Sequence, residues 1–266
     1  MKKKILILDD YKPIKKVFVK RLKKYSLTFK TFKKNKDLSK YLINNKFYAI
    51  YSAFGYKLDQ KLLEVTQNEL NYIISPTTGT DHIDLNFCEK KKIKVLTLKN
   101  EKNFLKSISA TAELTWALIL ALAKNINHFS DDVKNKQNWC RNKYQNHDLK
   151  GNSIGIIGYG RIGKIIFRYA KVFGMKTFVY EKSKKIIKLT KNVKFVSLKK
   201  ILNCKFITIH IPLDGNESFF SKRIFNKLKK DSFLINTSRG DIFNESHLIN
   251  FIKSKSIKGF GFDVLP

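Results

Sequence analysis

The first chemically suggestive feature of the sequence is a glycine-rich run, Gly-Tyr-Gly-Arg-Ile-Gly, at residues 158–163. Apolar residues before it predict a strand, and an amphipathic stretch after it predicts a helix. At such a junction Gly158 permits a tight turn, Gly160 lets the backbone approach a pyrophosphate, and Gly163 allows the helix to pack closely on the strand. The N–H groups at the start of the helix add oriented donors for an anion. The pattern predicts a dinucleotide site, and the alternative is a glycine-rich turn without a ligand.

A carboxylate follows at the end of the next predicted strand. Glu181 stands 18 residues after Gly163, close to the spacing at which an acidic side chain reaches the ribose of a dinucleotide. It can accept hydrogen bonds from both ribose hydroxyls and would repel a 2′-phosphate, which favours NAD over NADP. Three lysines close behind it weaken this preference: Lys182, Lys184 and Lys185.

A single arginine follows another apolar run, residues 232–235, within the sequence Asn-Thr-Ser-Arg-Gly-Asp. In an open α/β sheet, ligands bind at the carboxyl ends of the strands. A guanidinium there can hold a carboxylate with two parallel hydrogen bonds and polarise a neighbouring carbonyl, which a lysine ammonium does less well. Arg239 is therefore a candidate catalytic and substrate-binding residue, with a surface ion pair as the alternative.

Two more loops follow predicted strands. His210 ends the apolar run 206–209, so it lies either beside a cofactor or as a hydrogen-bonded histidine at a strand end. Thr78 and Gly79 could offer backbone N–H groups to a small anion. The alternative for that loop is an ordinary turn in which Asp84 caps the next helix. The sequence predicts no metal site, because the remaining histidines lack metal-ligand spacing: His82, His128, His147 and His247.

Short apolar runs alternate with helical patterns along most of the chain, which predicts an α/β fold with parallel sheets. The strands are predicted at residues 4–8, 48–52, 72–75, 94–98, 153–157, 176–181, 205–210, 232–236 and 257–263. From about residue 107 the series is interrupted by a long helix that is apolar nearly all round, as expected for a helix packed between layers. A polar stretch at 125–150 follows, with little strand character. We therefore predict two domains, residues 1–105 and 106–266.

Composition favours a cytoplasmic globular protein. The 266 residues are 43% hydrophobic, enough for a large core. No apolar run approaches the ~20 residues of a membrane span, and the apolar stretch 5–8 after the basic start is too short for an export signal. The cysteines are far apart and form no C-x-x-C pair, which fits a reducing compartment without disulfides or zinc: Cys88, Cys140 and Cys204.

The formal net charge is +33, from 54 basic and 21 acidic residues. A basic surface attracts polyanions, so a nucleic-acid partner is one interpretation. However, 48 of the basic residues are Lys, whereas Arg is the better partner for phosphates and bases. The lysines are also spread along the whole chain. We therefore expect solvated lysine-rich faces and weak nonspecific adhesion, without a specific nucleic-acid partner.

Six motifs in order resemble the D-isomer-specific 2-hydroxyacid dehydrogenase family, including its phosphoglycerate dehydrogenase-like members, over essentially the whole chain. They are Thr-Gly-Thr-Asp-His-Ile-Asp at 78–84, Ser-Ala-Thr-Ala-Glu at 109–113, Gly-Tyr-Gly-Arg-Ile-Gly at 158–163, His-Ile-Pro-Leu at 210–213, Asn-Thr-Ser-Arg-Gly-Asp at 236–241 and Gly-Phe-Asp-Val at 261–264. Several motifs in one order are more specific than any single motif. The resemblance implies NAD as the cofactor and a small D-2-hydroxy acid or 2-oxo acid as the substrate.

The resemblance also implies two Rossmann-like domains, an incomplete flavodoxin-like substrate domain followed by a doubly wound parallel-sheet NAD-binding domain. Arg239 would bind the substrate carboxylate and keto oxygen, and backbone donors of Thr78 and Gly79 would bind the same carboxylate. Hydride would pass between nicotinamide C4 and substrate C2. The implied cofactor-binding residues are Gly158, Tyr159, Gly160, Arg161, Ile162, Gly163, Glu181, His210, Pro212, Thr237 and Asp263.

The chain departs from the family after Asp263 and Val264. In the family a catalytic Glu follows this motif by a few residues and a catalytic His lies further on, and this pair moves the hydroxyl proton. Neither follows before Pro266. We therefore expect this chain to be a truncated fragment of an enzyme and to be inactive by itself. The alternative is a catalytically silent NAD-binding regulatory module that ends here naturally.

The resemblance leaves the acid unspecified, because Ser75 stands where some relatives carry Arg before the loop. Family members are commonly dimers through the nucleotide domain, so a complete protein is expected to form a homodimer. The long helix at residues 107–124 is a candidate contributor to that interface.

Overall fold

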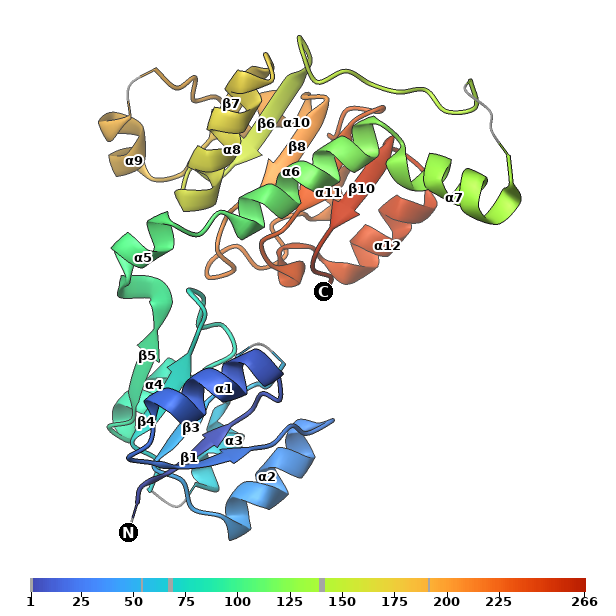
Figure 1. Ribbon diagram of the computed structural model, residues 1–266. Coiled ribbons are helices and arrows are strands. Elements are labelled where there is room, and N and C mark those ends of the chain that lie inside the picture. Colours follow the sequence, from blue (N-terminus) through green and yellow to red (C-terminus); the bar gives the residue numbers. More distant parts are fainter. Residues whose placement is uncertain (1, 54, 67–68, 139–141, 191) are drawn as a thin grey trace. The chain divides into compact units, whose positions relative to one another are not determined.

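In the computed structural model the chain forms two compact units, residues 1–105 and 106–266 (Figure 1). Each unit contains one parallel five-stranded sheet with helices on its faces. The α/β class expected from the sequence is therefore confirmed. The structure describes residues 2–53, 55–66, 69–138, 142–190 and 192–266.

The sheet of the first unit has the strand order β2-β1-β3-β4-β5, the flavodoxin-like order. Its strands are β1 (Lys4–Ile7), β2 (Ser26–Phe29), β3 (Ala49–Tyr51), β4 (Tyr72–Ser75) and β5 (Lys94–Thr97). All of them pair in parallel. The sequence did not predict β2, because this edge strand is only half-buried and its sequence Ser-Leu-Thr-Phe gives a weak apolar signal.

Helices cover the two faces of this sheet unequally. One face carries α2 (Asn35–Asn44), α3 (Gln60–Glu64) and α4 (Leu85–Lys90). Their buried side chains form a core with the strands: Leu38, Leu42, Leu62, Leu63 and Phe87. The other face packs Ile5, Ile7, Ala49 and Tyr51 against Phe18 and Leu22. Those two residues belong to α1 (Lys12–Arg21) or follow it directly, and α1 has no fully buried residue. This second face is therefore the more thinly covered of the two.

The sheet of the second unit has the order β10-β9-β8-β6-β7. Its strands are β6 (Ser153–Ile157), β7 (Lys176–Tyr180), β8 (Phe206–Ile209), β9 (Phe233–Asn236) and β10 (Gly259–Phe262). A single parallel bridge from Val179 to Phe195 extends the sheet beyond β7. With that bridge counted as a short third strand, the order becomes 3-2-1-4-5-6, the order of dinucleotide-binding domains.

The long apolar helix lies on one face of this sheet. Here α6 (Ala110–Ala123) contacts β9, β10 and α8 (Arg161–Val172) (Figure 1). The opposite face carries α10 (Leu198–Leu202), α11 (Lys222–Phe225) and α12 (Glu245–Lys253) around a phenylalanine-rich core. Within the second unit α6 packs on this one sheet face and its Leu114 is 40% exposed, so the expected packing between two layers stays a prediction.

The polar stretch after α6 contains a helix that the sequence did not predict, α7 (Ile126–Lys136). Within it Asp132 is buried and forms ion pairs with Lys136 and Lys143. Together these ammonium groups hold the pKa of Asp132 down at about 2, with the hydrogen bond from Lys143 as the largest cause.

The remaining helices are α5 (Lys102–Lys106) and α9 (Lys184–Leu189), with 3-10 turns at Leu98–Asn100 and Gly240–Ile242.

Among the residues that the structure describes, one helical stretch is long and apolar enough to cross a membrane, by length and composition alone. It spans Lys102–Ala123, 22 residues that comprise α5 and α6. This stretch was not predicted from the sequence, because it contains no uninterrupted apolar run of about 20 residues. The α6 part buries Thr115, Trp116 and Ile119 against the second unit, as a core helix does.

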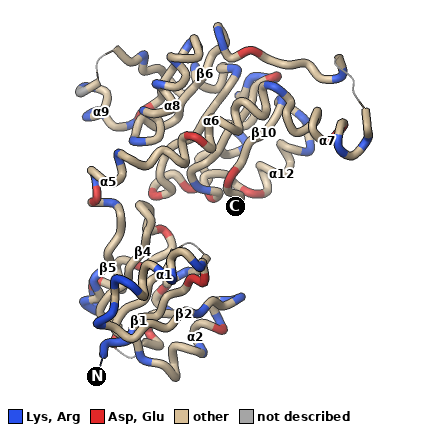
Figure 2. The backbone as a smooth tube through the Cα atoms, in the orientation of Figure 1, with Lys and Arg blue, Asp and Glu red and all other residues tan. Residues whose placement is uncertain are grey.

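Basic residues are spread over both units. Figure 2 shows Lys and Arg on most helices and connections. Two of the cysteines, Cys88 and Cys204, are buried free thiols, and burial raises the pKa of each to about 11. The third, Cys140, lies outside the described residues.

Candidate functional site

The crossover in the second sheet places two strand ends side by side. The chain runs from β6 to β7 on one side and then returns to β8 on the other side of β6, which makes this edge a topological switch point. Gly158 follows β6 with a φ of +96°. A Cβ at this position would lie 2.6 Å from the carbonyl oxygen of His210, which follows β8. Only glycine fits here, because both the conformation and the contact exclude a side chain.

The rest of the glycine-rich run joins β6 to α8 in two different ways. Gly160 is the N-cap of α8, has no side-chain cap, and a Cβ built on it meets no atom within 4 Å. A Cβ on Gly163 would lie only 2.1 Å from the carbonyl oxygen of Gly158. Gly160 therefore keeps space open above the helix N-terminus, whereas Gly163 lets α8 approach the strand.

Glu181 is held beside this loop by two backbone donors. Its Oε2 accepts a hydrogen bond from the N–H of Tyr159 at 2.8 Å, and its Oε1 accepts one from the N–H of Ser183 at 2.9 Å. A carboxylate has about four lone-pair sites, so each oxygen can still accept a ligand hydroxyl. The half-buried carboxylate is thus fixed at the end of β7, next to the turn after β6.

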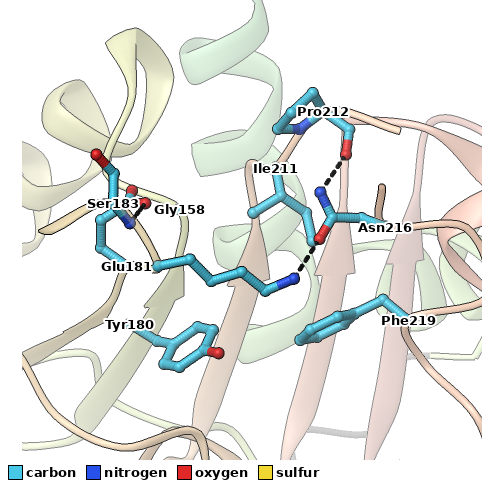
Figure 3. Close-up of a pocket in the computed structure, with 9 residues that line it drawn as sticks. Gly158, Tyr180, Glu181, Ser183, Ile211, Pro212, Asn216 and Phe219 are labelled. Atoms are coloured by element: carbon cyan, nitrogen blue, oxygen red, sulfur yellow. Dashed lines mark hydrogen bonds between the residues drawn. The ribbon is translucent and has the colours of Figure 1, made fainter. Parts of the chain in front are cut away.

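A cavity of about 350 Å³ opens at this edge (Figure 3). It is lined by Gly158, Tyr180, Glu181, Lys182, Ser183, Ile211, Pro212, Asn216 and Phe219. In Figure 3, Asn216 and Phe219 lie across the cavity from Glu181 and Ser183. Among the predicted site residues, Gly158, Glu181 and Pro212 line it. The sequence analysis missed Asn216 and Phe219, although the Pro-Leu-Asp-Gly-Asn turn before them marks a loop at a strand end.

His210 lies at the switch point as a neutral side chain. Its Nε2 pairs with the hydroxyl of Thr208 at 2.9 Å. Desolvation by burial lowers the pKa of His210 to about 3. This pair confirms the interpretation of a hydrogen-bonded histidine at a strand end, and a place beside a cofactor stays a prediction.

We expect this histidine to make stability depend on pH. Between pH ~6.5, the ordinary pKa of an imidazole, and the folded pKa of about 3, the unfolded chain binds a proton that the folded chain excludes. Stability should therefore fall as the pH drops through this window, by up to about 1.4 kcal/mol per pH unit. Urea unfolding at several pH values between about 5 and 6.5, above the range in which carboxylates such as Asp132 take up protons in the unfolded chain, would measure the slope, and His210→Gln should flatten it.

Salt provides the control for this experiment. The net charge of +33 also disfavours the folded state through self-repulsion, but added salt screens exposed charges and leaves a buried imidazole largely unaffected. A slope that high salt removes, or that His210→Gln leaves unchanged, would contradict a role for His210.

Three other predicted residues lie at neighbouring strand ends. Thr237 is buried, and its hydroxyl pairs with that of Thr115 in α6 at 2.7 Å. Asp263 is exposed, and its N–H donates to the carbonyl of Asn236 at 3.0 Å. Arg239 is half-buried in the loop after β9, and its carbonyl accepts a hydrogen bond from the side-chain amide of Asn236 at 2.9 Å. These residues share the carboxyl edge with the cavity without lining it.

Within the glycine-rich run, the side chains have distinct surroundings. The ring of Tyr159 is buried against Phe167 and Phe195 in the core. Ile162 packs on the same core. Arg161 is half-buried, and its Nη1 donates to the carbonyl of Ile108 at 2.6 Å, just before α6.

The first unit holds the other predicted loop. Thr78 is exposed and Gly79 half-buried, and the hydroxyl of Thr77 donates to the carbonyl of Gly79 at 2.7 Å. The same hydroxyl pairs with Ser75 at 2.9 Å, so these two buried side chains fix the loop, a role that the sequence did not predict for either of them. Asp84 caps α4 through the N–H of Phe87 at 2.9 Å, which confirms the capping alternative for Asp84.

Among the described residues there is no group of three or more His, Cys, Asp or Glu side chains that could hold a metal ion. The second unit instead combines the 3-2-1-4-5-6 strand order, a glycine-rich turn into a helix and a carboxylate at the end of the neighbouring strand. Those features define a dinucleotide-binding α/β protein.

Comparison with known proteins gives the family. Residues 116–266 match the model of the D-isomer specific 2-hydroxyacid dehydrogenase NAD binding domain. The chain belongs to the D-isomer specific 2-hydroxyacid dehydrogenase family, and its second unit carries the NAD-binding domain of that family. The cofactor expected from the sequence, NAD, is thereby confirmed.

Two curated relatives and one solved structure illustrate the likeness. The chain is 33% identical over 225 residues to a glyoxylate reductase of Thermococcus litoralis, which covers 81% of this chain and 66% of the relative. It is 32% identical over 191 residues to a D-3-phosphoglycerate dehydrogenase of Dictyostelium discoideum, which covers 71% and 45%. The structure of Aquifex aeolicus D-lactate dehydrogenase with NAD and lactic acid matches with a TM-score of 0.82 and 26% identity, covering 98% and 77%.

Proposed function

We propose that this protein is an NAD-dependent oxidoreductase that transfers a hydride between the nicotinamide and a small D-2-hydroxy acid or 2-oxo acid. The observation that carries the proposal is the cavity at the switch point, bounded by the turn at Gly158 and the carboxylate of Glu181. The relatives named above, which include a glyoxylate reductase and a D-lactate dehydrogenase, support this substrate class.

The residues present fit NAD. Gly160 leaves open space at an N-terminus without a side-chain cap, where backbone N–H groups can bind a pyrophosphate. Glu181 is fixed where it can accept hydrogen bonds from ribose hydroxyls. When bound, NAD supplies the hydride acceptor, and NADH supplies the hydride donor.

Arg239 is the proposed substrate-binding and catalytic group. It follows β9 at the carboxyl edge of the sheet, and Asn236 holds its backbone in place. A guanidinium can bind a carboxylate through two parallel hydrogen bonds and stabilise charge on a neighbouring keto oxygen. In the first unit, we propose that the backbone N–H groups of Thr78 and Gly79 are further donors for a small anionic substrate.

Proton transfer needs a group that titrates near neutral pH. His210 does not meet this requirement, because burial lowers its pKa to about 3. The matched relatives are longer than this chain, and α1, which packs on one face of the first sheet, has no fully buried residue. We therefore propose that the catalytic His and Glu belong to a further segment of a longer protein, which also completes the first unit.

The remaining proposals concern setting and partners. We propose a cytoplasmic protein that forms a homodimer when complete, with α6 and its exposed Leu114 as a candidate contact. We propose no membrane partner, because α6 packs on β9, β10 and α8. The spread of lysines over both units argues against a specific nucleic-acid site (Figure 2).

Two linked assays test the proposed function. The 266-residue chain should bind NADH, measured by titration calorimetry, and a gene that extends beyond codon 266 into Glu and His should encode a protein that oxidises NADH with a 2-oxo acid. In that extended protein Arg239→Gln should retain NADH binding but lose most of the turnover. If the extended protein binds NADH and reduces no 2-oxo acid of a panel, the proposed reaction is wrong.

A silent NAD-binding regulatory module is the second candidate. It is favoured by the lining of the cavity, which includes no histidine among the described residues and so can bind a nucleotide without an imidazole for proton transfer. Sequencing the gene through codon 266 in independent isolates separates the two candidates. A stop codon at this position in every isolate, with NADH binding intact, would favour the module.

A further inference from the structure

The side chain of Lys182 crosses the cavity and pairs with a residue on the far side instead of with its neighbour Glu181. Lys182 follows Glu181 directly, but its ammonium donates to Oδ1 of Asn216 at 2.8 Å. The same nitrogen lies 5.3 Å from the centre of the Phe219 ring. Asn216 and Phe219 line the cavity across from Glu181 (Figure 3). The cation is therefore held on the side of the cavity that lies away from the ribose-binding carboxylate.

Asn216 is well fixed for this contact. Its amide nitrogen donates to the carbonyl oxygens of Pro212 at 3.0 Å and Asp214 at 3.3 Å. Its backbone N–H donates to the carbonyl of Leu213 at 2.7 Å, and Gly215 makes the turn with a φ of +67°. Because the amide nitrogen is committed to the loop, Oδ1 must face the cavity and accept from the lysine.

The position of the ammonium matters for the choice of coenzyme. The carboxylate of Glu181 favours a ribose with free hydroxyls, whereas a lysine on a flexible stem could turn back and neutralise a 2′-phosphate. We propose that Asn216 is a specificity-determining residue: by holding Lys182 across the cavity, it keeps a cation away from the ribose and strengthens the preference for NAD over NADP. The inference rests on the cavity being the adenosine side of the proposed cofactor site.

The test compares dissociation constants of NADH and NADPH for the 266-residue chain, measured by titration calorimetry at about 0.15 M salt. Asn216→Ala should strengthen NADPH binding about tenfold relative to NADH, because it releases Lys182. Asn216→Ala/Lys182→Gln should lose this gain, and Lys182→Gln alone should show none. Asn203→Ala is the matched control, since Asn203 is an exposed asparagine whose amide donates to the carbonyl of Lys199 at 2.8 Å and is not among the residues that line the cavity.

The readout is the ratio of the NADH and NADPH dissociation constants within one variant. General damage to the loop would weaken both coenzymes alike and would leave this ratio unchanged. An unchanged ratio in Asn216→Ala, with NADH still bound by the unmodified chain, overturns this inference alone. A gain that persists in the double variant also overturns it, because the cation responsible is then another one. Failure of the unmodified chain to bind NADH would remove the proposed function together with this inference.

Discussion

Replacing Gly160 with valine is expected to abolish NAD binding while leaving the fold intact. A Cβ at this position meets no protein atom within 4 Å, and φ is not positive. The protein therefore has room for the side chain, but the open space above the N-terminus of α8 is where a pyrophosphate must approach. We expect NADH affinity to fall at least about 100-fold, or roughly 2.7 kcal/mol. Stability should change by at most about 1 kcal/mol from the altered N-cap.

Calorimetric titration with NADH and urea unfolding of the same preparation measure both effects. Ser197→Val is the matched control, because Ser197 is also an N-cap with extended backbone and no side-chain cap, at α10. It should change stability to a similar extent and leave NADH affinity unaltered. If Gly160→Val binds NADH like the unmodified chain, the phosphate site lies elsewhere.

Replacing Gly163 with alanine is expected to lower the stability of the fold, in contrast to the substitution at Gly160. Here a Cβ would lie 2.1 Å from the carbonyl oxygen of Gly158 and 3.5 Å from the side chain of Ile156. The alanine variant must push α8 off the strand, although this helix buries Ile165, Ile166 and Ala170 against the sheet. We expect Gly163→Ala to lose about 3 kcal/mol of stability, as overpacking typically does.

Helix propensity predicts the reverse sign for this substitution. Alanine is favoured over glycine inside a helix by about 1 kcal/mol, so a loss of stability would show that the contact with Gly158 prevails. Thermal unfolding should show the melting temperature lowered by roughly 6–12 °C. Gly160→Val serves as the comparison, since its side chain enters open space. A Gly163→Ala variant as stable as the unmodified chain would show that α8 does not need this close approach.

Local pattern was enough to locate most of the second unit. Strand β6 has the predicted bounds, and the glycine-rich run joins it to a helix. Glu181 follows β7 as its spacing indicated. These predictions succeed because strand and helix periodicity, and the backbone demands of a phosphate turn, depend on residues close together in the sequence.

Elements with a weak local signal were missed. The edge strand β2 is only half-buried, and the buried residue within α7 itself is the polar Asp132. A regular spacing of apolar residues indicates that one face of an element packs against a core. Neither segment has a pronounced apolar face. Motifs from the resemblance implied roles for Thr237 and Asp263, but these two side chains do not line the cavity found here.

The sequence by itself determined the fold class, the phosphate turn and the carboxylate beside it, since each is written in neighbouring residues. Only the tertiary structure decided which distant residues complete the site. It placed Gly158 against His210, paired Lys182 with Asn216 34 positions further on, and joined Thr115 to Thr237 across 122 positions. Such contacts follow from the order in which parallel strands pair, and that order results from burial of the whole sheet and not from any local pattern.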